Sequence, residues 1–156
     1  MSLRNELVKL ALKWEKQFGV APNITGIVGE YDVAMQVGLD EEEYSYCMRG
    51  TTAVQRGHDF IYNDKKYQVK ACRPSGKPGS KITKGPDVRN YDWDYLVWVR
   101  YNKNYQVQEM WRFGRNKFEL LFADKKRLTP DDMRMGKCLF SIENKSLTNK
   151  RGKNVN

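Results

Sequence analysis

The sequence of 156 residues is poor in the side chains that bind soft metals or form cross-links. It has three cysteines and one histidine. The cysteines, Cys47, Cys72 and Cys138, form no CxxC pair, and three thiols cannot all pair with one another. With His58 as the single imidazole, a zinc site would have too few ligands. We therefore expect reduced thiols and no zinc.

Long apolar runs are also missing. No stretch approaches the length of a membrane span, and the first ten residues, MSLRNELVKL, lack the hydrophobic centre of a signal peptide. The sequence thus predicts a cytoplasmic protein without a membrane partner. Its length suits one domain with one core, and its 40% hydrophobic and 12% aromatic content argues against wholesale disorder.

Positive charge is in excess. Lysine and arginine number 28 against 19 aspartates and glutamates, a net charge of +9. Such an excess suits a polyanion such as nucleic acid, although a small basic protein without that function would look the same. We predict a single domain over residues 1–142 and a basic, mobile tail over residues 143–156, which could add affinity for phosphates.

Hydrophobic periodicity predicts a mixed α/β fold, with helices packed on a central sheet. Residues 40–57 show little periodicity, and the acidic run at 40–43 is read as a solvated loop. Trp14, Trp98 and Trp111 are expected in the core, and Trp93 is a candidate for contact with a base. The predicted helices are 3–18, about 25–37 and 116–123; the strands are 58–62, 66–73, 95–101, 105–113 and 138–142; a long loop covers 74–90.

One predicted hairpin carries a constellation suited to phosphodiester chemistry. Asp59 begins its first strand, and Gln68 and Lys70, two positions apart, share one face of the second. The backbone carbonyl of Val69 lies between them. A carboxylate, an amide oxygen and a carbonyl are ligands that Mg²⁺ takes, and a nearby ammonium can stabilise charge on a phosphate. Taken singly, each residue is more often a solvated strand residue.

These residues, in this order, resemble the PD-(D/E)XK nuclease superfamily, which has the restriction-endonuclease-like fold. The matching segments run from about residue 24 to residue 122: GIVGEYDVAMQVGL at 26–39, His58-Asp59, Gln68-Val69-Lys70, and the strands DYLVWVRYN and QEMWRFGR. The resemblance implies a metal-dependent DNA endonuclease that uses Mg²⁺ or Mn²⁺. Two sites are needed to cut both strands, so it also implies a homodimer.

The resemblance also implies roles for the site residues. Asp59 would be the central metal ligand, with the Val69 carbonyl beside it, and Lys70 would position water or stabilise the phosphate. Gln68 stands where the superfamily has an aspartate or glutamate, and a neutral amide binds Mg²⁺ more weakly. Glu30 could compensate for that lost charge, if Gly26 and Gly29 let its helix approach the hairpin closely.

Basic residues around the hairpin are the candidate nucleic-acid contacts: Arg56, His58, Arg73, Lys77, Lys81 and Lys84. Two alternatives remain open. The same fold with a degenerate site would bind nucleic acid without cutting it, because Q-x-K variants of both kinds exist in the superfamily. A nuclease that processes RNA would differ only in its substrate.

Overall fold

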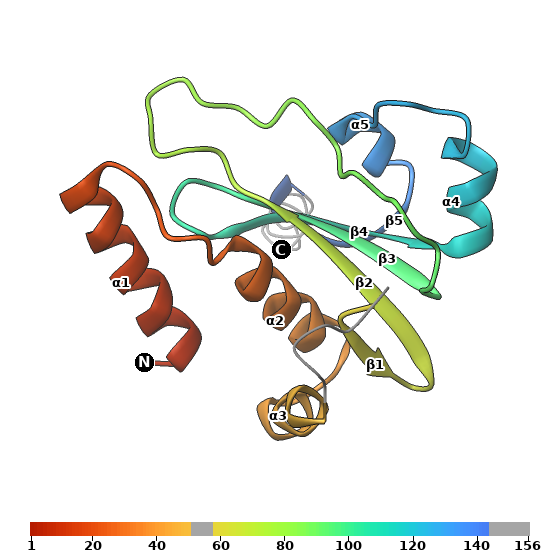
Figure 1. Cartoon of the computed structure of the whole chain (residues 1–156), viewed down its shortest axis with the longest axis horizontal. Coiled ribbons are helices and arrows are strands. Elements are labelled where there is room, and N and C mark those ends of the chain that lie inside the picture. Colours follow the sequence, from red (N-terminus) through yellow and green to blue (C-terminus); the bar gives the residue numbers. More distant parts are fainter. Residues whose placement is uncertain (51–57, 144–156) are drawn as a thin grey trace, which may run out of the picture.

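The computed structural model describes residues 1–50 and 58–143, and five helices and five strands lie within them. Figure 1 shows how they are arranged. Most of the predicted basic tail, residues 144–156, lies outside the described residues. Among the described helices, none is long and apolar enough to cross a membrane. In chain order the elements are α1 (Leu3–Phe18), α2 (Thr25–Val37), α3 (Glu41–Arg49), β1 (Phe60–Tyr62), β2 (Lys65–Cys72), β3 (Tyr95–Tyr101), β4 (Val107–Gly114), α4 (Arg115–Phe122), α5 (Pro130–Met133) and β5 (Lys137–Ser141).

The strands form a single open sheet in the order β1-β2-β3-β4-β5. Only β2 and β3 are parallel, and every other neighbouring pair is antiparallel. The middle strand, β3, is buried along most of its length, as its continuous apolar run predicts. The parallel pair needs a long crossover, and residues 73–94 supply it without a helix. The prediction of a mixed α/β domain is confirmed.

Two apolar clusters cover the two faces of the sheet. Val69 and Val99 belong to the cluster that packs against α1 and α2, whereas Leu96 and Trp98 belong to the cluster under α4 and α5. The alternation of side chains along each strand separates these sets. In Figure 1, α1, α2 and α3 lie on one side of the sheet, and the crossover loop, α4 and α5 lie on the other.

Helix α2 lies directly against β2 because a glycine faces the strand. A Cβ on Gly29 would stand 2.5 Å from the Cβ of Ala71 and 3.3 Å from Val99 Cγ1, so no larger residue fits without movement. The expected close approach at Gly29 is confirmed. The same expectation for Gly26 is wrong, because a Cβ there would meet nothing within 4 Å.

The N-terminal helices differ from the sequence prediction in two ways. Trp14 is 54% exposed rather than in the core, because α1 docks through the small residues Val8 and Ala11. Residues 41–49 form a helix, α3, which the weak periodicity of this segment did not predict. Asp40 and Glu43 form a capping box at its start, so the acidic run is a helix N-terminus rather than a loop.

The crossover loop is fixed to the body of the protein. Its apolar residues Ile82, Val88 and Tyr91 pack against the cluster under α4, and the Gly85 N–H donates to the Leu128 carbonyl at 2.8 Å. Trp93 is only 1% exposed, so the predicted contact between Trp93 and a base is wrong. The loop is therefore a folded layer whose polar side chains face outward.

Candidate metal-binding site

Asp59 occupies the point where β1 diverges from β2. Its backbone N–H donates to the Tyr67 carbonyl at 2.7 Å, which extends the β1–β2 ladder by one step. The next hydrogen bonds to β2 are made by the Asp59 side chain rather than by its backbone. Oδ2 accepts from the Val69 N–H at 2.7 Å and from Gln68 Nε2 at 3.1 Å. The Asp59 carboxylate is thereby held at the edge of β2, next to Gln68, as the hairpin register predicts.

The polar groups of β2 that face Asp59 include a backbone carbonyl. In a strand, the N–H and C=O of one residue point to the same edge, so the Val69 carbonyl faces Asp59 as its N–H does. Gln68 at present offers its amide nitrogen to Asp59. A half-turn about the last bond of Gln68 would offer Oε1 instead, so this side chain can serve either as a donor or as a ligand.

Glu30 reaches Asp59 from α2. The two carboxyl groups share a hydrogen bond, and burial together with the negative charge of Asp59 raises the pKa of Glu30 to about 7. Burial also raises the pKa of Asp59, although the bonds from Val69 and Glu30 oppose that shift. Two carboxyl groups in contact favour sharing a proton over ionising together. Near neutral pH, the pair therefore holds a proton that a cation could replace.

Two basic residues act on the carboxyl pair electrostatically. The charges of Lys70 and His58 favour the ionised form of Asp59 and lower its pKa against the effect of burial. Lys70 shares a strand face with Gln68, and so also with Cys72, which packs under the crossover loop. The ammonium of Lys70 therefore lies on the same side of the sheet as the loop, and its charge acts on Asp59 without an ion pair between them.

Tyr44 of α3 lies close enough for its phenol to be affected by the charges of Glu30 and Asp59, and no sequence motif indicated this. Burial, followed by the charges of Glu30 and Asp59, raises the pKa of the Tyr44 phenol to about 12. The phenol therefore stays protonated and can donate a hydrogen bond. Its link to the site depends on how α3 packs, and the capping box of α3 was the only local signal that this helix exists.

The donor set fits a hard divalent cation. Asp59 and Glu30 supply carboxylate oxygens, and Gln68 and Val69 can supply an amide and a carbonyl oxygen. Mg²⁺ takes such oxygens and completes its shell with water. Within residues 1–50 and 58–143, no three histidine, cysteine, aspartate or glutamate side chains are grouped closely enough to hold a metal. The site would therefore rest on two carboxylates.

Arg73 does not join this group, which corrects the expected phosphate contact. It follows Lys70 by three positions, so the alternation of the strand does not place the two side chains on one face. Its guanidinium binds Glu15 of α1 at 2.9 and 3.0 Å, lies over the ring of Tyr105 and has a side chain only 5% exposed. Arg73 ties α1 to the sheet.

The remaining basic residues are placed as follows. Lys77, Lys81 and Lys84 are exposed on the crossover loop and could contact a backbone that crosses it. His58 lies beside Asp59. Arg56 lies outside the described residues.

Comparison with known proteins identifies no relative: no family model matches the chain, and no curated protein matches it significantly. Only the residues of the site itself therefore indicate a function.

Proposed function

We propose that this chain is a metal-dependent DNA endonuclease of the restriction-endonuclease-like, PD-(D/E)XK kind. The observation that carries the proposal is the Glu30–Asp59 carboxyl pair at the edge of β2, where the charge of Lys70 acts on Asp59. Helix, hairpin and central strand also follow in the order that the resemblance implies. A site that concentrates negative charge within a chain of net charge +9 is suited to a cation bound between protein and phosphate.

The site residues would have the following roles in phosphodiester hydrolysis. Asp59 and Glu30 would hold Mg²⁺ or Mn²⁺, with the Val69 carbonyl and a turned Gln68 amide as weaker ligands. The bound cation would neutralise phosphate charge and lower the pKa of an attacking water. Lys70 would hold the scissile phosphate or orient that water, and the Tyr44 phenol would donate a hydrogen bond. The exposed loop lysines would bind the flanking backbone.

The test is nicking of supercoiled plasmid in the presence of Mg²⁺ or Mn²⁺. Lys70→Ala should lower the nicking rate by about 10²-fold or more and leave DNA binding nearly unchanged, because removal of one stabilising charge typically has this effect. Lys126→Ala is the matched control, since it removes an equally positive but exposed charge outside the site. It should nick at the wild-type rate.

One observation favours a second candidate, a binding module with a degenerate site. Gln68 replaces a third carboxylate and donates to Asp59 in place of a ligand oxygen. In that case the protein would bind DNA but would not nick it with any divalent metal, and Mn²⁺ titration would show no saturable site. Cleavage of duplex RNA without cleavage of DNA would instead identify an RNA-processing nuclease.

A further inference from the structure

Helix α1 exposes an apolar stripe on the side that faces away from the sheet. Leu3, Leu10 and Phe18 are 79%, 65% and 62% exposed, and Trp14 is 54% exposed. The stripe continues onto α2, where Ile27 is 59% exposed. We define the α1 stripe as these apolar residues together with one more leucine: Leu3, Leu7, Leu10, Trp14, Phe18 and Ile27.

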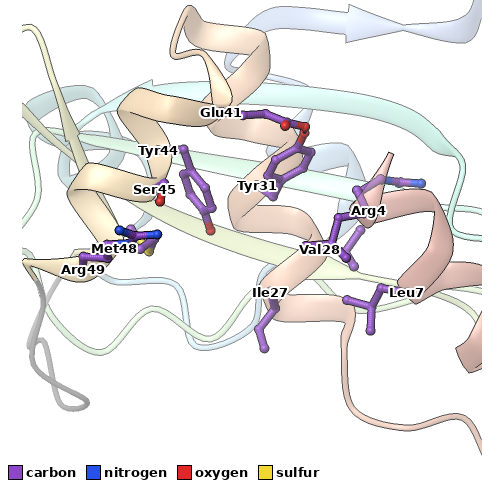
Figure 2. Close-up of a pocket in the computed structure, with 11 residues that line it drawn as sticks. Arg4, Leu7, Ile27, Val28, Tyr31, Glu41, Tyr44, Ser45, Met48 and Arg49 are labelled. Carbon is purple, nitrogen blue, oxygen red and sulfur yellow. The ribbon is translucent and has the colours of Figure 1, made fainter. Parts of the chain in front are cut away.

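The α1 stripe could form the apolar centre of a protein interface. Its six members are large apolar or aromatic side chains, and together they expose on the order of several hundred Å². Apolar patches of this size are often functional, and a stable interface of roughly 800 Å² on each partner would add the polar residues around the stripe. The stripe also borders a cavity of about 520 Å³ between α1, α2 and α3. Figure 2 shows Leu7 of α1 and Ile27 of α2 at this cavity.

The spacing within α1 is that of a helix–helix seam. Leu3, Leu7, Leu10 and Trp14 follow each other at intervals of four, three and four residues, which is the alternation of heptad positions d, a, d and a. A helix that docks on its own domain needs a broader stripe, and α1 already docks through a different side, with Val8 and Ala11. The α1 stripe is therefore suited to a second helix.

Charges beside the seam indicate which helix and in which direction. Glu6 and Lys13 occupy the two g positions next to the stripe, and both are exposed. In an antiparallel pair the g positions face each other, so Glu6 of one chain would meet Lys13 of the other, twice by symmetry. A parallel pair would leave both charges without partners.

We propose that two copies of this chain associate through an antiparallel pairing of their α1 stripes. Leu7 of each copy would pack on Leu10 of the other, and Trp14 would pack on Leu3 at the mouth of the cavity between α1, α2 and α3. This dimer goes beyond the proposed cleavage chemistry and stands without it. If that chemistry holds, the dimer supplies the two sites that double-strand cutting needs.

The first test is the mass of the full chain by sedimentation velocity over a concentration series. Wild type should approach twice the chain mass of 18.3 kDa. Leu10→Glu should return it to the monomer mass, with unchanged circular dichroism because Leu10 is exposed. Leu120→Glu is the matched control, since Leu120 is 86% exposed on α4, away from the stripe, and this variant should remain dimeric.

The second test separates the antiparallel dimer from its alternatives. Glu6→Lys and Lys13→Glu should each weaken the homodimer by about tenfold, because each creates two like-charge contacts. Mixing the two variants should restore a dimer with the wild-type dissociation constant. Wild type that stays monomeric at every concentration overturns the proposal, and so does a dimer that both reversals leave unchanged. Monomers that bind phosphatidylserine vesicles through Leu10 would assign the stripe to a membrane surface instead.

Discussion

The pKa values of two carboxyl groups in this protein, Glu109 and Glu30, shift in opposite directions. Glu109 on β4 accepts from Arg100, Arg134 and Trp111 at 2.6–3.0 Å, and these bonds lower its pKa although burial opposes them. Glu30 is half-buried and meets another carboxyl group, and its pKa rises to about 7. The positive charges of two arginines offset the negative charge of Glu109. The negative charge of the Glu30–Asp59 pair is less fully compensated. The first arrangement stabilises the fold, and the second leaves a place for a cation.

Isosteric amide substitutions should separate the two sites most clearly. Glu109→Gln should lower the free energy of unfolding by about 2–3 kcal/mol, because it leaves two arginines without their carboxylate. Their side chains are 31% and 39% exposed, so water recovers part of the loss. Glu30→Gln should leave stability unchanged or raise it by up to about 1 kcal/mol, because it removes repulsion with Asp59.

Urea unfolding at pH 8 in EDTA measures both effects. Mn²⁺ titration supplies the complementary readout, because Glu30→Gln should weaken Mn²⁺ binding whereas Glu109→Gln should not. Equal destabilisation by the two substitutions, with no change in Mn²⁺ affinity, would show that both carboxylates have structural roles.

The second prediction concerns the helix that brings Glu30 to Asp59. Gly29→Ala should cost about 1–3 kcal/mol, because its Cβ would overlap that of Ala71 and push α2 away from β2. Gly26→Ala, in the same helix but facing open space, should be neutral or stabilise by up to about 1 kcal/mol through helix propensity.

The position of α2 can be read from the titration of Glu30. In Gly29→Ala, the larger separation from Asp59 should bring the pKa of Glu30 down from about 7 toward its ordinary value. Carboxyl chemical shifts followed against pH would show this. If Gly29→Ala is as stable as Gly26→Ala, the close packing of α2 against β2 does not position the site.

The third prediction uses pH, since the two sites should respond with opposite sign. The Glu30 pKa is raised from 4.5 to about 7 in the folded protein, so the folded state binds the extra proton and Glu30 favours folding less as pH rises through 7. The Glu109 pKa is lowered, so its contribution is present above 4.5 and is lost as pH falls through the folded value.

Unfolding free energies of wild type and both amide variants, measured in EDTA over this range, test these signs. Glu30→Gln should remove the decline in stability near pH 7, and Glu109→Gln should remove the decline on the acid side. A wild-type decline near pH 7 that persists in Glu30→Gln would assign the titration to another group.

Local pattern predicted the hairpin of the site but not its surroundings. Strand alternation is a short-range property, so the pairing of Asp59 with Gln68 followed from the sequence. The placement of Arg73 did not, because its partner Glu15 lies 58 positions away and only tertiary packing joins them. Tyr44 was missed for the same reason: α3 has few apolar residues, and its helix depends on a cap.

Helix α1 shows a second limit of sequence patterns. Its apolar periodicity predicted a helix correctly, but it indicated the wrong buried side. Val8 and Ala11 are small, so they contribute little to the pattern, yet they dock α1 beside the Arg4–Asp32 ion pair. Hydrophobic periodicity identifies a surface to be covered and not the partner that covers it.

The last and smallest expected effect comes from restoring a carboxylate at position 68. Gln68→Glu should raise Mn²⁺ affinity by about tenfold, because a charged ligand replaces a neutral one. In EDTA the same substitution should lower the melting temperature, since a third carboxylate joins a pair that already shares a proton. Mn²⁺ should reverse that loss by binding the folded state.

A matched Gln108→Glu variant on β4 should change neither quantity. If Gln68→Glu loses stability in EDTA and Mn²⁺ does not restore it, the carboxyl pair is a strained structural contact. Recovery with Mn²⁺, in contrast, would show that the shortage of positive charge around Glu30 and Asp59 is what a metal ion supplies.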